Sequence, residues 1–444
     1  MTRALFMTII TQEKDSLHRS DVTVPAIGKI RSMDLLAKTK KKILAIEAIR
    51  GFAAIYVMFG HVIQLYQPYS FFPEYRFAVK TLFGYGNEAV ILFFIVSGFS
   101  IHYSSSSIAF SQKESIKKYV FKRFRRIYPL YLLSLIISLV VLWITHMPFG
   151  INSIILSFAL LTDVSDGAFA SPISTNFPIW SLSYEAVYYL LYPVLLIVFR
   201  KTGIRNMIIY SVIISLVAGG ISLSVYRNHF SNIIQLYWVW VAGAVIADFK
   251  MNGENFKFSY LKGLVMLCFA FMVTVEKWHL FRDWSCALFF SLLMFSFFVQ
   301  EETNNISQKV GNVAIGLFAA AVCYCLTFSP SVVIHFHLLR YILILISVFS
   351  ILIVFIPIEL FRRCMRMILK PFTKAGTISY AIYIFHWPLI ILTTYIFKDV
   401  MNKNLPLMLL VIGMNLMTVF LMSWYAELKL QPRIVDYLNG WFAR

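Results

Sequence analysis

Long apolar runs alternate with short polar segments along most of the chain. A membrane-spanning helix needs about 20 mainly apolar residues. Runs of that kind begin near Ile43, Glu88, Tyr128, Tyr184, Met207, Ile233, Tyr260, Trp284, Gly311, His335, Thr377 and Leu405. The pattern predicts an all-α polytopic transmembrane helix bundle of about 10–12 helices. The apolar stretch 151–161 is too short to span, so we expect it to be re-entrant or interfacial.

Less apolar segments lie at both ends of the region that holds the apolar runs, and one further segment of this kind lies within it. Residues 1–42 are polar and mixed in charge, and they lack the apolar core of a signal peptide. We therefore expect a disordered cytoplasmic tail over 1–42. The alternative is that residue 1 is an early start codon, since a second methionine, Met33, lies further along. Residues 43–426 are predicted to form the transmembrane domain, and 427–444 a short cytoplasmic tail. The stretch 146–184 is predicted to form a small external cap.

Composition agrees with a lipid environment. The chain is 59% hydrophobic, 17% aromatic and only 14% charged, whereas soluble domains are about one quarter charged. Five cysteines lie in or beside apolar runs without disulfide or zinc spacing. We interpret them as small core residues, and we expect no metal site.

The formal net charge of +19 has two interpretations, a nucleic-acid surface or the cytoplasmic side of a membrane protein. The positive residues gather at 38–42, 113–126, 200–205 and 362–374, each time between apolar runs. Placing 38–42 in the cytoplasm puts all four clusters there, together with both chain termini. This favours a protein of the cytoplasmic (inner) membrane, with the bilayer and no nucleic acid as a partner.

Two ionisable residues, Arg50 and His61, lie in the first apolar run. Eleven residues turn a helix by about 1100°, close to three full turns, so both side chains share one face, about 16 Å apart along the axis. Glu47 lies near the same face. Intramembrane charge commonly marks a functional site. Arg50 suits a phosphate at the cytoplasmic boundary, and His61 suits a general base; lipid contact and helix packing are the structural alternatives.

The segment from Lys113 to Arg126 carries seven positive residues, more than membrane orientation requires. With Arg50 at the same depth, these residues would form a cytoplasmic pocket for a phosphorylated ligand. Attraction to anionic lipid is the alternative.

Glu185 follows Ser183, which we expect to cap the start of a helix at the external face. Glu185 is then either part of the cap or a carboxylate that orients the histidine or contacts a sugar. Ser97 and Gly98 place small residues in mid-span, which favours close helix packing.

Five segments together resemble the membrane acyltransferase-3 family, whose members modify bacterial glycans. They are Arg50-x10-His61, Phe94-Ile-Val-Ser97-Gly98-Phe99, Arg125-Arg126-Ile-Tyr128-Pro129-Leu-Tyr131, Trp180-Ser181-Leu-Ser183-Tyr184-Glu185 and Ile378-Ser379-Tyr380-Ala-Ile-Tyr383-Ile-Phe-His386-Trp-Pro388. One departure is Glu47-Ala48 where the family commonly has Asp-Gly.

The resemblance implies transfer of an acyl group, most often acetyl, from cytoplasmic acyl-CoA to a hydroxyl of an extracytoplasmic carbohydrate. O-antigen of lipopolysaccharide, capsule and exopolysaccharide are candidate acceptors. Acyl-CoA would be a co-substrate, with no tightly bound cofactor, and polysaccharide-assembly proteins are candidate partners. A transporter or flippase for an anionic or glycolipid substrate, and a scaffold for such assembly, are the alternatives.

The resemblance also assigns roles. His61 becomes the catalytic base or a transient acyl carrier, and Glu185 supports the external end. The CoA phosphates would be bound by Arg50, Arg123, Arg125 and Arg126. The supporting residues are Glu47, Ser97, Gly98, Trp180, Ser183, Tyr188, Tyr380 and His386.

Overall fold

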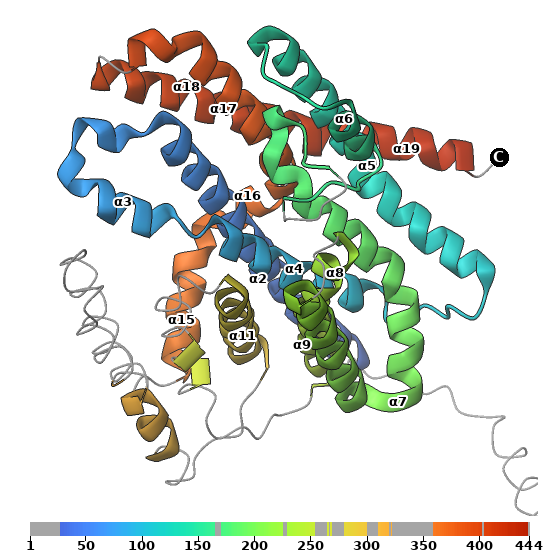
Figure 1. Cartoon of the computed structure of the whole chain (residues 1–444). Helices are drawn as coiled ribbons and strands as arrows, with labels where there is room; N and C mark the ends of the chain where they lie inside the picture. The colour runs from blue at the N-terminus through green and yellow to red at the C-terminus, as the bar shows by residue number, and fades with distance from the viewer. Residues whose placement is uncertain are drawn as a thin grey trace, which may run out of the picture. The chain divides into compact units, whose positions relative to one another are not determined.

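The computed structural model describes residues 27–164, 170–224, 229–253, 264–265, 267–268, 279–299, 310–318, 321, 358–401 and 404–442. Every regular element in these ranges is helical, which confirms the predicted all-α class (Figure 1). Seven helical stretches within them are long and apolar enough to cross a membrane. The chain divides into two units, residues 1–44 and 45–444, and the site described below belongs to the second.

The α-helices are α2 (Ile27–Tyr66), α3 (Arg76–Phe83), α4 (Gly86–Ser105), α5 (Lys113–Thr145), α6 (Ile151–Phe158), α7 (Trp180–Ser224), α8 (His229–Gln235), α9 (Tyr237–Asn252), α11 (His279–Phe298), α15 (Ile358–Leu369), α16 (Thr373–Gly376), α17 (Ser379–Met401), α18 (Leu405–Tyr425) and α19 (Gln431–Phe442). Short 3-10 turns precede α3, α7 and α16, and a π-helix, Ala426–Leu430, joins α18 to α19. The predicted runs near Tyr260 and His335 lie outside the described residues, so the total of 10–12 spans stays a prediction.

Three boundaries differ from the sequence-based expectation. α2 begins at Ile27, so 27–42 is helical where a disordered tail was predicted; this part is rich in the helix formers Leu, Ala and Lys. α7 begins at Trp180, directly after a 3-10 turn that contains Pro178, so Ser183 lies inside the helix and does not cap it. The segment predicted as a short cytoplasmic tail, 427–444, is helical to Phe442 and packs on α5.

Helix α7 is interrupted at Gly203, whose φ of 81° is open to glycine but strained for other residues. The two helical parts on either side correspond to the separate runs predicted near Tyr184 and Met207. The apolar stretch at 151–161 contains the short helix α6 (Ile151–Phe158), which is too short to span a membrane, as predicted.

Helices α4 and α9 meet through glycines. A Cβ atom on Gly98 would overlap the carbonyl oxygen of Trp240, and one on Gly243 would overlap that of Ile95. The two backbones therefore touch, as the small residues predicted. This contact brings the Trp240 ring to Ser97, and Trp240 Nε1 donates to Ser97 Oγ at 3.2 Å.

Helices α2, α17 and α18 form a second packed group. Ala54 and Met58 of α2 pack against Ile378 and Ile382, and α17 and α18 lie side by side (Figure 1). A Cβ on Gly376 would overlap the Glu47 carbonyl, so the chain just before α17 lies against α2 beside Arg50.

Helix α5 has 33 residues and is about 50 Å long, whereas the hydrocarbon core of a bilayer is about 30 Å thick. Its basic first third therefore extends beyond the apolar span. Pro129 lies inside the helix and has no N–H for the carbonyl of Arg125. Gln431 Nε2 donates to the carbonyls of Arg125 (2.8 Å) and Arg126 (3.0 Å), and Tyr380 OH donates to that of Ile127 at 2.8 Å. The proline thus leaves the Arg125 carbonyl open to Gln431 of α19, and the next two carbonyls accept bonds from Gln431 and from Tyr380 of α17.

Candidate active site

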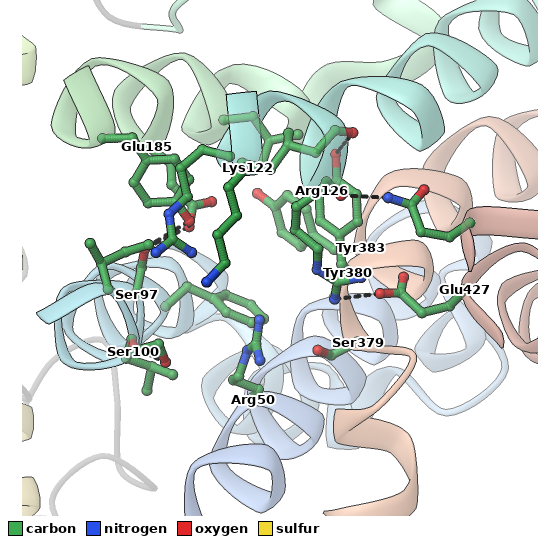
Figure 2. A pocket seen from close by; sticks show the side chains of 18 of the residues that line it. Arg50, Ser97, Ser100, Lys122, Arg126, Glu185, Ser379, Tyr380, Tyr383 and Glu427 are labelled. Atoms are coloured by element: carbon green, nitrogen blue, oxygen red, sulfur yellow. Dashed lines mark hydrogen bonds and ion pairs between the residues drawn. The ribbon is translucent and has the colours of Figure 1, made fainter. Parts of the chain in front are cut away.

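A cavity of about 690 Å³ lies where α2, α4, α5, α7, α17 and the C-terminal segment meet. This volume is within the usual range of ligand pockets, about 300–1,000 Å³. Figure 2 shows charged side chains from several helices directed toward it. The charged residues that line it are Glu47, Arg50, Lys122, Arg123, Arg125, Arg126, Glu185, Glu427 and Asp436.

Each arginine of the cavity is held by a polar partner. Arg50 Nη1 is 3.0 Å from Glu47 Oε1, and Arg126 Nη2 is 2.5 Å from Glu427 Oε1. Arg123 Nη2 donates to Ser105 Oγ at 2.7 Å and to Ser104 Oγ at 3.2 Å. Arg125 donates to the Asn439 side chain. Since a guanidinium carries five N–H donors, each arginine keeps further donors for a ligand.

Lys122 differs from these arginines. Its ammonium group reaches into the cavity in Figure 2. Within the described residues no hydrogen bond or ion pair involves it, so its charge is available to an anion. Five cationic and four acidic side chains line the cavity. Its net charge is therefore small, but the individual guanidinium and ammonium groups provide positive sites for an anion.

Glu185 lies on the α7 wall of this cavity. Its Oε1 accepts a hydrogen bond from Ser97 Oγ at 2.6 Å and another from Tyr189 OH. Trp240 in turn donates to Ser97, so the carboxylate ends a chain of two donors and accepts from Tyr189 directly. Glu185 therefore faces the cavity of the arginines, whereas the sequence-based prediction put it with His61 at the external end.

His61 does not line the cavity. Its Nδ1 is 3.2 Å from Gln64 Oε1, its ring stacks on His386 with centroids 5.3 Å apart, and its edge contact with Trp387 is 4.7 Å. His386 is fully buried; its Nδ1 bonds the Ile382 carbonyl, and its Nε2 has no partner among the described residues.

Tyr383 separates the cavity from the histidine pair. Its ring lines the cavity and lies 6.0 Å from the His386 ring, and Phe93 packs on it at 5.5 Å. Arg50 lines the cavity together with Tyr380 of α17, and His61 contacts α17 at His386. Both therefore lie on the α17 side of α2, which agrees with the shared helix face that the spacing predicted, but their surroundings differ.

The remaining predicted site residues have structural contacts. Tyr188 OH donates to the Ile233 carbonyl at 2.7 Å, and Thr162 N donates to Ser183 Oγ at 3.2 Å. The Trp180 ring packs edge-on against Tyr184, and Gly98 allows the α4–α9 contact. These four support the walls without facing the cavity.

Several lining residues were not singled out from the sequence as site residues. They are Ser100, Lys122, Ser379, Tyr383, Glu427, Gln431 and Asp436. Glu427 had a recognisable feature, a carboxylate directly after the last long apolar run. Lys122 lay within the basic segment but could not be told from its neighbours without the side-chain contacts.

Comparison with known proteins identifies one family. A family model described as an acyltransferase domain matches residues 43–300, more than half of the chain. The acyltransferase MdmB of Streptomyces mycarofaciens is 28% identical over 170 residues, covering 37% of this chain and 41% of that protein. The chain thus matches less than half of this relative's length. No solved structure matches.

Proposed function

Because this chain belongs to the membrane acyltransferase-3 family, we propose that it moves an acyl group from cytoplasmic acyl-CoA to a hydroxyl of an extracytoplasmic carbohydrate. Acetyl-CoA is the first donor to test. O-antigen, capsule and exopolysaccharide are the acceptor classes to test, and the cytoplasmic (inner) membrane is the proposed location.

One observation carries the proposal: Arg50 lines a cavity rich in cationic side chains, and His61 lies farther along the same helix. CoA carries several phosphate oxygens, which guanidinium groups bind in a bidentate manner. We assign the phosphates to Arg50, Arg123, Arg125 and Arg126. The thioester end would then extend past Tyr383 toward the histidine pair.

In the proposed reaction His61 acts as the general base. With Nδ1–H donating to Gln64 Oε1, the lone pair is on Nε2. The acceptor hydroxyl gives its proton to Nε2 while its oxygen attacks the thioester carbonyl carbon. The ester C–O bond forms, the C–S bond breaks, and the CoA thiolate takes up the proton from the imidazolium.

The first test is acyl transfer by His61→Ala. Purified protein in liposomes would receive labelled acetyl-CoA and a glycan acceptor, and transferred label would be measured. His61→Ala is expected to lose transfer, while His146→Ala, which changes an exposed histidine outside the cavity, keeps it. Normal transfer by His61→Ala would overturn the catalytic role, and glycolipid movement without acyl-CoA turnover by the wild type would identify a transporter instead.

The acceptor is to be identified from the glycans themselves. Mass spectrometry and NMR of surface glycans, with and without the gene, should differ by one acyl group on a defined hydroxyl. Identical glycans in both strains would count against every carbohydrate acceptor on the cell surface.

A further inference from the structure

The segment after the last span, residues 426–442, builds one wall of the cavity. It continues α18 through the π-helix Ala426–Leu430 into α19. Glu427, Gln431, Pro432, Val435 and Asp436 line the cavity from this side. Figure 2 shows Glu427 approaching Arg126 from outside the group of basic side chains. The π-helix matters here because such turns often occur at functional sites.

The ion pair between Glu427 and Arg126 is asymmetric. The Glu427 side chain is 3% exposed, whereas that of Arg126 is 45% exposed, and the two are 2.5 Å apart. The carboxylate is therefore buried behind the guanidinium, and the guanidinium faces the cavity. Because Glu427 contacts Nη2, and no other side-chain hydrogen-bond or ion-pair partner of Arg126 occurs in the described part of the chain, the other N–H donors can bind a second anion.

The backbone beneath Arg126 is held by the same segment. Gln431 Nε2 donates to the carbonyls of Arg125 and Arg126, and Pro129 leaves the first of these without a helix donor. Asn439 accepts a hydrogen bond from the Arg125 side chain. Three residues of the C-terminal segment, Glu427, Gln431 and Asn439, therefore fix both the main chain and the side chains of this arginine pair.

We propose that Glu427 is a positioning residue for donor binding: it holds the Arg126 guanidinium in the orientation that contacts a CoA phosphate. The inference rests on the proposed function, because it assumes that the cavity takes acyl-CoA. An ion pair serving only stability would need no exposed guanidinium face, whereas this arrangement fixes one nitrogen and presents the others.

The test uses the full-length protein in liposomes and measures initial rates against acetyl-CoA concentration. Glu427→Gln is expected to raise the donor KM by about 10-fold with kcat within about 2-fold, the result of lost donor contact without lost chemistry. Glu359→Gln is the matched control, since Glu359 pairs with Arg362 at 2.8 Å on an exposed helix outside the cavity. It should leave KM unchanged.

A double-mutant cycle separates positioning from stability. If Glu427 acts through Arg126, Glu427→Gln has no further effect on KM in the Arg126→Ala background. An unchanged KM in Glu427→Gln, or an equal further increase in that background, would overturn the proposal.

Removing a buried partner can also impair folding, so a second measurement uses Glu427→Asp and needs no turnover. CoA should raise the melting temperature of the wild type. The rise should be smaller for Glu427→Asp and absent for Arg126→Ala. Equal rises for all three proteins would overturn the inference. Glu427–Arg126 coupling in CoA binding without acyl transfer would reject only the proposed function. Acyl transfer without this coupling would reject only the positioning role.

Discussion

Lys122 is the cavity's cation with no described partner, and this predicts a direct contact with the donor. Lys122→Met should raise the donor KM by about 10-fold, since a hydrogen bond to a charged group contributes about 1.5–3 kcal/mol. Lys118→Met is the control, because Lys118 is exposed on the same helix and does not line the cavity. Equal KM values for the two variants would remove Lys122 from the site.

Gln64 controls which nitrogen of His61 is free. Its Oε1 accepts from Nδ1, so Gln64→Leu removes the preference for the tautomer with a basic Nε2. Orienting partners of this kind typically contribute about 10–100-fold in activity. We expect a kcat loss in that range with the donor KM unchanged. A KM effect without a kcat effect would contradict this role.

At the scale of elements, the contact of α4 with α9 depends on two glycines. Gly98→Ala would place a Cβ on the Trp240 carbonyl and should destabilise the bundle by about 1–3 kcal/mol, as overpacking does. Gly413→Ala is the control, because nothing lies within 4 Å of a Cβ there. Thermal unfolding in detergent measures both variants, and equal stability would show that the helices adjust without strain.

Pro129 interrupts the hydrogen bonding of α5, and Gln431 supplies the donor that is missing there, so their effects on stability should depend on each other. Gln431→Leu leaves the Arg125 carbonyl of α5 without a donor, removes a second bond to the Arg126 carbonyl, and should cost about 1–3 kcal/mol. Pro129→Ala restores an N–H for the Arg125 carbonyl, so the cost of Gln431→Leu should fall in that background. Additive effects on unfolding would indicate that the proline and the glutamine act independently.

Element boundaries show what local sequence can predict. Apolar length located α4, α17 and α18 to within a few residues, because span length is set by the bilayer. The start of α7 was misplaced, since Pro178 favours a turn that runs directly into the helix. The Gly203 break needs a positive φ that no apolar pattern records.

For the whole molecule, the charge distribution predicts which end of the helix bundle faces the cytoplasm. In a cysteine-free background, Lys201→Cys should react with an impermeant maleimide in inverted vesicles, and Phe149→Cys in intact cells. Lys201 is near the basic end of the bundle and Phe149 follows the opposite end of α5; both are exposed. The reverse labelling pattern would place the basic cavity outside the cell.

The site was only partly predictable at this scale. Helical spacing predicted that Arg50 and His61 share one helix face, and the charge run indicated the arginines. The C-terminal wall was missed because Arg125 and Gln431 are 306 residues apart, and no local pattern links them. The pairing of His61 with His386 likewise depends on the packing of α2 against α17.

The ring contact of Phe93 with Tyr383 sets a requirement for the proposed reaction. Both rings line the cavity, and Tyr383 lies between it and His386. An acyl group that travels from the cavity to the histidine pair must therefore displace these rings, so the side-chain rotation of Tyr383 becomes a step of the reaction.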